Sequence, residues 1–314
     1  MMYLPFNFFV QFLAAAAITP GSDTLSEQEL IARYPAIAAA ATVLLVAGLI
    51  CDLYLVIRFA RPALSNNPST GYRPALKVDS KPWDLRDLFT ATSAVIFVLL
   101  AGELVVTLTF RFMHWTQDSA LPCLLVVDMI LRVVVLFGFV FYFRQRGIDW
   151  RRAFGFRGSP RAGAIGWGAT LFVAVLPPLW ATFALSSQFC RWVGIREEPQ
   201  DVSTLLATSG SVAVVALITV LAIAIAPVFE ELLFRGFAYP VLKQRWGACK
   251  ALVVVSVAFA AIHLHLPSLA PLFALAVGLG LAYELTGSLL APITMHVLFN
   301  AANVLMILYV RAHP

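Results

Sequence analysis

The chain has 314 residues, of which 61% are hydrophobic and only 12% charged, and its mean hydropathy is +0.85. Because soluble domains carry about 25% charged residues, this composition excludes a soluble globular protein. The net charge of +5 comes from residues in short connecting segments that form no single basic face, which argues against nucleic-acid binding.

Residues 1–19 are apolar and end in four alanines, but they lack the basic region that opens a signal peptide. We expect an additional helix or an interfacial segment there. Eight further apolar stretches approach or exceed the roughly 20 residues that a membrane-spanning helix needs. They cover residues 36–57, 88–110, 120–143, 164–189, 202–229, 251–266, 268–283 and 285–310. The sequence therefore predicts an all-α, polytopic membrane protein, a bundle of about eight transmembrane helices.

Basic residues are concentrated in every second connection between these stretches, which indicates the orientation of the chain. By the positive-inside rule the basic connections lie in the cytoplasm, and both chain ends lie outside if residues 1–19 do not cross. If that segment crosses, the N-terminus is cytoplasmic; in a bacterium the membrane would be the plasma membrane. We divide the chain into an N-terminal apolar segment (1–34), N-terminal helices with basic loops (35–200) and a C-terminal transmembrane region (201–314). The proline-rich connection 61–87 is expected to be the most flexible.

Ionisable side chains within the apolar stretches need an explanation, because each costs about 3 kcal/mol at the centre of a spanning helix. Asp128 and Arg132 are four residues apart, so we interpret them as a neutralising pair on one helix face. Asp52 lies near a helix end and can reach the interface. Glu103 is harder to explain, although an interhelical hydrogen bond in its protonated form would satisfy it.

The strongest local anomaly is a pair of adjacent glutamates, Glu230 and Glu231, at the end of a long uncharged stretch. On a helix, Glu231 and Arg235 share a face and can pair, while Glu230 points elsewhere. Pro227 removes a backbone donor, so we expect a kink that frees a carbonyl and opens space beside Glu230. The alternative is that the chain simply leaves the membrane here, with all three charges at the interface.

Two later apolar segments carry polar side chains at one-turn spacing. Phe259 is followed by His263, and His296 is followed by Asn300. Either segment alone is weak evidence, since a single histidine in a membrane helix commonly makes a packing hydrogen bond. Together with Glu230 they supply a carboxylate, two imidazoles and a carboxamide on three helices, the groups that water activation and oxyanion stabilisation need.

The order and spacing of these residues resemble the CPBP intramembrane proteases, which include the type II CAAX prenyl endopeptidases and the Abi or bacteriocin-processing proteins. That family has the pattern EExxxR, FxxxH and HxxxN. This chain has the corresponding residues Glu230, Glu231, Arg235, Phe259, His263, His296 and Asn300. The resemblance covers roughly residues 205–310, and upstream the helices match only in number and hydrophobicity.

The resemblance implies an intramembrane endopeptidase, with residues 201–314 as its catalytic region. Glu230 would be the general base that activates water, helped by His263. His296 and Asn300 would hold the oxyanion, and Glu231 with Arg235 would support the structure. These roles agree with the stronger hydrogen bonds that polar groups make where water is scarce.

A cofactor and partners are also implied by the resemblance. The family is often described as metal-dependent, and Glu230, His263 and His296 form a ligand set of the kind that Zn2+ accepts. No HExxH helix is present, so a zinc or other divalent-metal mechanism and a metal-free glutamate mechanism both stay open. The expected partners are the lipid bilayer and a membrane-anchored or lipidated peptide or protein, with prenylated CAAX-type termini as one class.

Two other functions fit parts of the sequence. In an ion- or proton-coupled transporter, Asp52, Glu103, Asp128 and the two adjacent glutamates would form a relay, although internal repeat symmetry is missing. A non-catalytic membrane scaffold or immunity protein could keep the family fold and bind a partner. Retention of all three motifs makes the second alternative weaker than the protease.

Overall fold

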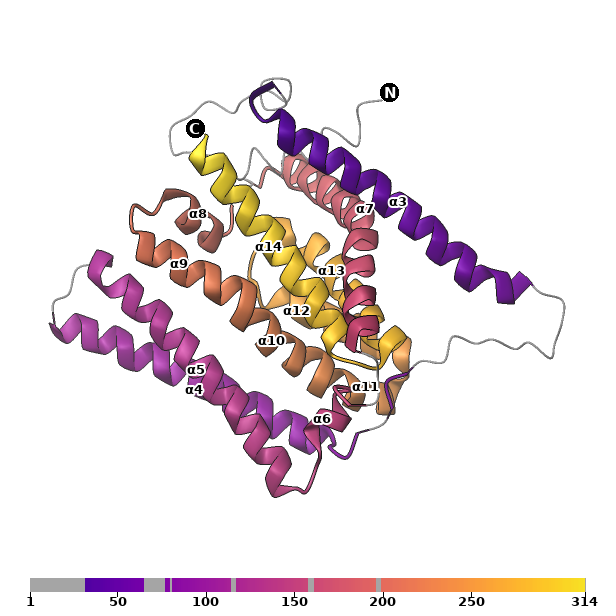
Figure 1. The fold of residues 1–314 in the computed structure, drawn as a ribbon. Coiled ribbons are helices and arrows are strands. Elements are labelled where there is room, and N and C mark those ends of the chain that lie inside the picture. Colours follow the sequence, from indigo (N-terminus) through magenta and orange to yellow (C-terminus); the bar gives the residue numbers. More distant parts are fainter. Residues whose placement is uncertain are drawn as a thin grey trace.

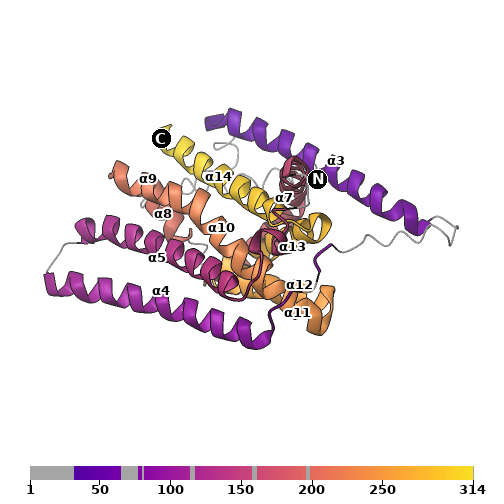
Figure 2. The same cartoon turned by 60° about the horizontal axis from the view of Figure 1, so that its bottom comes forward.

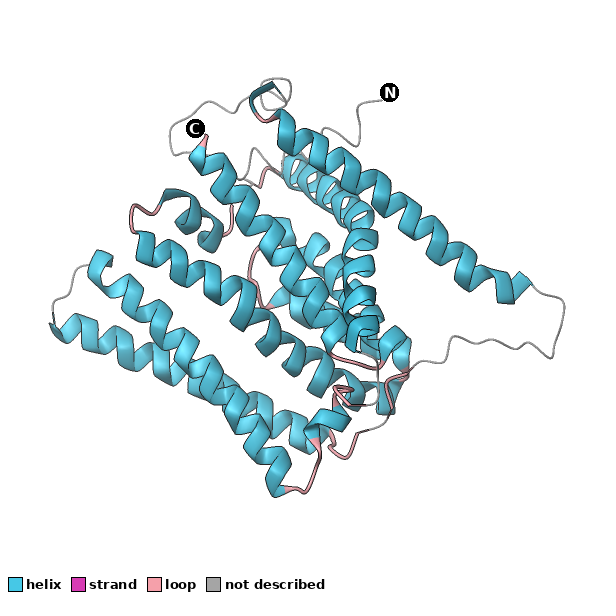
Figure 3. Cartoon of the chain, in the orientation of Figure 1, coloured by secondary structure: helices cyan, strands magenta, loops and turns pink. Residues whose placement is uncertain are grey.

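The structure is a computed structural model that describes residues 32–64, 77–79, 81–113, 117–157, 161–195 and 199–313. Those residues form helices and connecting loops, without a strand among them (Figure 3). Seven helical segments within this part of the chain are long and apolar enough to cross a membrane. The protein is therefore a multi-pass integral membrane protein, as predicted. The expectation for residues 1–19 lies outside the described residues.

The helices fall into two sets along the chain. The first set is α3 (Pro35–Leu64), α4 (Leu85–Met113), α5 (Gln117–Gln145), the short α6 (Trp150–Ala153) and α7 (Arg161–Val193). The second set is α8 (Asp201–Thr208), α9 (Val212–Val220), η2 (Leu221–Ile225), α10 (Ala226–Glu231), η3 (Leu232–Ala238), α11 (Tyr239–Trp246), α12 (Ala248–Ala261), α13 (Leu266–Thr286) and α14 (Leu290–Ala312).

The expected span 202–229 is wrong in its boundaries. The short helix α8 ends at Thr208, and a separate helical run then extends without interruption from Val212 to Trp246. The break has a local cause, because the Ser211 hydroxyl accepts a hydrogen bond from the Val214 backbone N–H and so caps a new helix. Hydropathy shows where the chain is apolar, but this cap decides where the spanning helix begins.

The predicted bundle of about eight helices is confirmed, with one of them shorter than expected. The stretch predicted at 251–266 corresponds to α12 (Ala248–Ala261), whose 14 residues span about 21 Å, less than the roughly 30 Å of a bilayer core. Gly247, with a φ of +79°, separates α12 from α11. Pro267 lies in the first turn of α13, where its missing N–H costs no helical hydrogen bond.

The bundle is arranged around α7, α13 and α14. In Figures 1 and 2, α3 lies along α7 on one side, and the hairpin of α4 and α5 lies on the opposite side. The run from α9 to α11 lies between that hairpin and α14, because α5 packs against α9 and α10 while α14 packs against η2 and α10. The helices that carry the predicted site residues therefore meet in the middle of the bundle.

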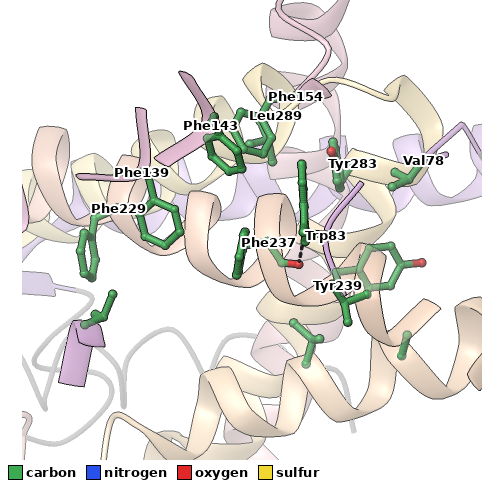
Figure 4. Packing of buried hydrophobic residues seen from close by; sticks show 14 of the residues in the cluster. Val78, Trp83, Phe139, Phe143, Phe154, Phe229, Phe237, Tyr239, Tyr283 and Leu289 are labelled. Carbon is green, nitrogen blue, oxygen red and sulfur yellow. Dashed lines mark hydrogen bonds between the residues drawn. The ribbon is translucent and has the colours of Figure 1, made fainter. Parts of the chain in front are cut away.

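The end of the connection 61–87 is packed, so the expectation of flexibility is wrong for its described part. We call residues 77–79 and 81–84 the strap. Within it, Val78 is 3% exposed and Trp83 is 2% exposed. Figure 4 shows Trp83 among buried aromatic rings, stacked on Phe237 at 5.5 Å with its indole N–H donating to the Phe237 carbonyl at 3.2 Å. The strap thus contacts η3, the segment that follows the two adjacent glutamates.

Glu284, near the end of α13, anchors the other part of the strap. Its carboxylate accepts hydrogen bonds from the Tyr239 hydroxyl at 2.5 Å, the Lys243 ammonium at 2.6 Å and the Val78 N–H at 3.3 Å. Its carbonyl oxygen accepts from the Lys77 N–H at 3.0 Å. A buried carboxylate needs such partners to offset its lost hydration, and here they join three separate parts of the chain.

Candidate active site

A cavity of about 790 Å3 lies inside the bundle, and its walls come from α4, α5, α7 and the elements of the second set other than α11. Four of the predicted site residues line it, namely Glu230, His263, His296 and Asn300. The other two, Glu231 and Arg235, lie behind the wall and are 0% and 1% exposed. The structure therefore separates the two adjacent glutamates into one that reaches the cavity and one that is buried.

The buried pair has the geometry that helical spacing predicts. Arg235 Nη1 donates to Glu231 Oε1 at 3.0 Å, and Arg235 Nη2 donates to the Ala276 carbonyl at 2.9 Å. The guanidinium also lies over the Phe259 ring, with Cζ 4.7 Å from the ring centroid. Arg235 thus neutralises Glu231 and ties its helix to α12 and α13.

His296 lies between the two glutamates, which sequence reasoning missed. Its Nδ1 donates to Glu231 Oε1 at 2.9 Å, while its Nε2 lies 3.9 Å from Glu230 Oε2. The first contact is a hydrogen bond, and the second is too long for one. Because Nδ1 is engaged with Glu231, the ring is fixed with Nε2 directed toward Glu230, the orienting arrangement that catalytic imidazoles require.

Asn300 is held by a backbone carbonyl that Pro227 leaves without a helical partner. Within η2 the Ala226 N–H donates to the Leu221 carbonyl, so the next carbonyl, of Ala222, would need the N–H of residue 227. Proline has none. Asn300 Nδ2 supplies the missing donor at 2.8 Å from Ala222 O. The freed carbonyl that the sequence predicts therefore exists, and it positions the carboxamide.

His263 reaches the cavity from the end of α12. Its Nδ1 donates to the Phe259 carbonyl at 2.8 Å, which leaves Nε2 with a lone pair. The next residue, Leu264, has a φ of +49°, a conformation that costs a non-glycine residue about 1–2 kcal/mol. Within the described part of the chain, His263 makes no hydrogen bond to Glu230. His263 thus shares the cavity with Glu230 and His296 without contacting Glu230 directly.

Phe259 packs against three of the site residues, a role that its presence in the FxxxH pattern only hinted at. Its ring centroid lies 5.0 Å from that of His263 and 5.8 Å from that of His296. The ring is fully buried and also lies under the Arg235 guanidinium. Both imidazoles are therefore positioned by one aromatic side chain, and a smaller residue at 259 would loosen the site.

The positions of the side chains around the cavity determine whether a metal ion could bind there. Among the described residues, no group of three or more His, Cys, Asp or Glu side chains is placed to hold a metal ion. The predicted zinc ligands Glu230, His263 and His296 thus line one cavity without forming a coordination set. The zinc expectation stays a prediction.

The fold and site define a class, a multi-pass helical membrane protein with a carboxylate, two imidazoles and a carboxamide around one internal cavity. Residues 212–302 match the family model described as type II CAAX prenyl endopeptidase Rce1-like, just under a third of the chain. The predicted family is therefore confirmed: this part of the chain is an Rce1-like region of the CPBP type. The family implies a membrane protease. No curated protein and no solved structure matches the chain.

Proposed function

We propose that the protein is an intramembrane endopeptidase that hydrolyses a peptide bond of a membrane-anchored or lipidated substrate, with prenylated CAAX-type termini as the first class to test. The observation that carries the proposal is the position of His296, bonded to buried Glu231 on one side and directed toward Glu230 on the other. A histidine with a purely structural role does not need a second carboxylate beside it in the cavity. Activation of a water molecule does need such a carboxylate, because it must accept a proton.

The separation of 3.9 Å between Glu230 Oε2 and His296 Nε2 suits two groups that bind the same water molecule. Glu230 would take a proton from that water as its oxygen attacks the carbonyl carbon of the substrate. The developing oxyanion would accept hydrogen bonds from protonated His296 Nε2 and from the second N–H of Asn300 Nδ2. Protonated Glu230 would then give its proton to the departing nitrogen as the C–N bond breaks.

His263 has a secondary position in this scheme. Its Nδ1 is engaged with a helix carbonyl, so its Nε2 faces the cavity as an acceptor. It would orient the attacking water or the substrate N–H within the cavity. The resemblance assigns it the same supporting task.

The positions of the acidic residues that would form a proton relay do not favour the transporter alternative. Asp52 lies on α3 and Glu103 on α4, helices on opposite sides of the bundle in Figures 1 and 2. Glu103 is exposed on the outer surface of α4, and neither side chain lines the cavity. A proton relay needs contiguous groups, and these residues are not contiguous.

The proposal is tested with the purified wild type and the Glu230→Gln variant in lipid discs. Each is incubated with matched prenylated and unprenylated CAAX-type peptides, and the products are identified by mass spectrometry. We expect cleavage by the wild type and none by Glu230→Gln, because the amide cannot accept the proton of water. Glu103→Gln, which changes an exposed membrane glutamate outside the cavity, is the matched control and should cleave at the wild-type rate.

Three outcomes would count against the proposal in different ways. Cleavage by Glu230→Gln at the wild-type rate would remove Glu230 from the mechanism. Absence of cleavage of both peptides by the wild type would remove CAAX-type termini as the substrate, and membrane proteins that accumulate when the gene is deleted would be tested next. A phenotype that survives replacement of both Glu230 and His263 would instead favour a scaffold or immunity protein.

A further inference from the structure

The cavity contains a cationic side chain that the proposed reaction does not use. Arg132, on α5, is the only Lys or Arg among the described residues that line the cavity, and Glu230 is the only acidic one. It lies near the middle of a segment that spans the membrane. It also lies outside residues 212–302, so the family match does not account for it.

The contacts of Arg132 hold its guanidinium in place but occupy few of its hydrogen-bond donors. Nε donates to Asp128 Oδ2 at 2.8 Å, which is the pair that the sequence predicts. Cζ lies 5.1 Å from the centroid of the Phe229 ring, a cation–π contact that fixes the plane of the group. Nη1 and Nη2 have no hydrogen-bond partner among the described residues. Four of the five N–H donors are therefore left for a ligand in the cavity.

An anion is the ligand that these donors favour. A guanidinium binds a carboxylate or a phosphate through two parallel hydrogen bonds, and such bonds are strengthened in an apolar cavity. Among the described residues, the Asp128 carboxylate bonds only to Arg132, and it is itself partly exposed, with 34% of its side chain accessible. The single bond leaves room for a second negative group at the outer edge of the guanidinium.

The position of Arg132 relates this anion to the proposed reaction. Phe229, on which the guanidinium lies, precedes Glu230 directly in α10. Arg132 and Glu230 also line the same cavity, so a peptide that fills the cavity can reach both side chains. Every peptide has one carboxylate at its C-terminus and one ammonium at its N-terminus, and Arg132 attracts the first and repels the second.

We propose that Arg132 is the residue that binds the C-terminal carboxylate of the substrate. This inference rests on the proposed function, because it assumes that the cavity holds a peptide. Arg132 would then determine specificity and orientation. The chemical step would remain with Glu230.

The test measures binding separately from cleavage. A fluorescent prenylated peptide is prepared with a free C-terminal carboxylate and, as its match, with a C-terminal amide. Affinity for the full-length Glu230→Gln variant in discs of zwitterionic lipid is measured by fluorescence anisotropy. We expect the free acid to bind about tenfold or more tightly than the amide, the difference that one charge-assisted contact supplies.

Three further variants separate specificity from structure. Adding Arg132→Met should remove the preference for the free acid and leave the amide affinity unchanged. Because Arg132→Met leaves Asp128 without its partner in the membrane, the pair Asp128→Asn with Arg132→Met provides a variant with balanced charge and should behave in the same way. Arg132→Lys should restore part of the preference, since an ammonium keeps the charge and loses the paired geometry. In the cleaving protein, Arg132→Met should raise KM for the free acid with little change in kcat.

The outcomes distinguish this proposal from the proposed function. Equal affinity for the two peptides, absence of binding by both included, would overturn the role of Arg132 whether or not the wild type cleaves. A preference for the free acid that depends on Arg132, without cleavage, would support the site and count against the peptidase. If the two peptides bind equally and phosphatidic acid raises the unfolding temperature of the wild type but not of Arg132→Met, the anion is a lipid phosphate and the carboxylate proposal is wrong.

Discussion

Glu230 and Glu231 are neighbours in the sequence, yet their surroundings give them different tasks. Glu231 has no exposed surface and is bonded to Arg235 and His296, whereas 15% of the Glu230 side chain is accessible in the cavity. A charge that is buried with a partner stabilises the fold only as long as the partner is present. The two positions should therefore respond differently to substitution.

We expect Arg235→Met to lower the free energy of unfolding by about 3–5 kcal/mol, because it leaves the Glu231 carboxylate buried without its cation. Glu230→Gln should leave the unfolding temperature near that of the wild type, since the Glu230 side chain is partly accessible in the cavity and the amide keeps its size. Thermal unfolding of both variants in the same detergent measures the difference. Equal losses of stability in the two variants would show that Glu230 is structural as well, and would weaken its assignment as the general base.

Helical spacing was sufficient to predict some of these contacts and not others. The Glu231–Arg235 and Asp128–Arg132 pairs follow from positions four apart on one helix. The bond between His296 and Glu231 joins residues 65 positions apart, so it depends on how two helices are rotated against each other. The helical periodicity of a sequence does not predict how two helices are rotated against each other. For the same reason, the sequence showed that Arg132 has a partner but not that the remainder of its guanidinium borders a cavity.

At the scale of whole elements, the run from α9 to α11 departs from a regular helix twice, at η2 and η3. The wide turn at η2 accommodates Pro227, and Asn300 on α14 completes the hydrogen bonding of that turn. A polar side chain on one helix thus compensates for a proline on another. The sequence predicted a freed carbonyl near Pro227, but it could not identify the group that would bond to it.

This compensation predicts a measurable coupling. Asn300→Leu should lower the free energy of unfolding by about 1–3 kcal/mol, because the partly buried Ala222 carbonyl is left without a donor. In a Pro227→Ala background the loss should be smaller, since residue 227 then has an N–H that can reach the same carbonyl. A double-mutant cycle of unfolding free energies in detergent measures the coupling. Additive losses would show that Asn300 and Pro227 act independently.

Hydropathy predicted the number of spans better than their ends. Long apolar runs such as α4 and α14 are found where they were expected, because the bilayer selects apolar helices by length. The boundaries near 202–229 and 251–266 were missed because they are set by local features, the cap at Ser211 and the turn at Gly247. Such features are readable in a sequence only once the helix to which they belong is known.

At the scale of the whole molecule, the strap joins the two halves of the chain at one end of the bundle. Trp83 packs on Phe237 in η3 and on two further rings, those of Phe143 and Phe154, while Glu284 bonds to the backbone of Val78. The strap precedes α4 directly, so its docking fixes the α4–α5 hairpin against the helices that carry the site. The proline-rich composition that suggested flexibility does not report this packing, which depends on side chains more than 150 positions away in the sequence.

The packing of the strap therefore predicts that its loss would destabilise the entire bundle. Trp83→Ala should lower the free energy of unfolding by about 3–5 kcal/mol, the usual cost of removing a large buried aromatic side chain. Phe112→Ala, on the same helix that follows the strap, is the matched control, because Phe112 is 84% exposed on the outer surface and should change stability little. Thermal unfolding gives the difference, and limited proteolysis shows whether residues 77–84 become accessible in Trp83→Ala alone. If Trp83→Ala unfolds at the same temperature as Phe112→Ala and its strap stays resistant to protease, then the strap does not hold the α4–α5 hairpin in place, and contacts within the membrane must do so.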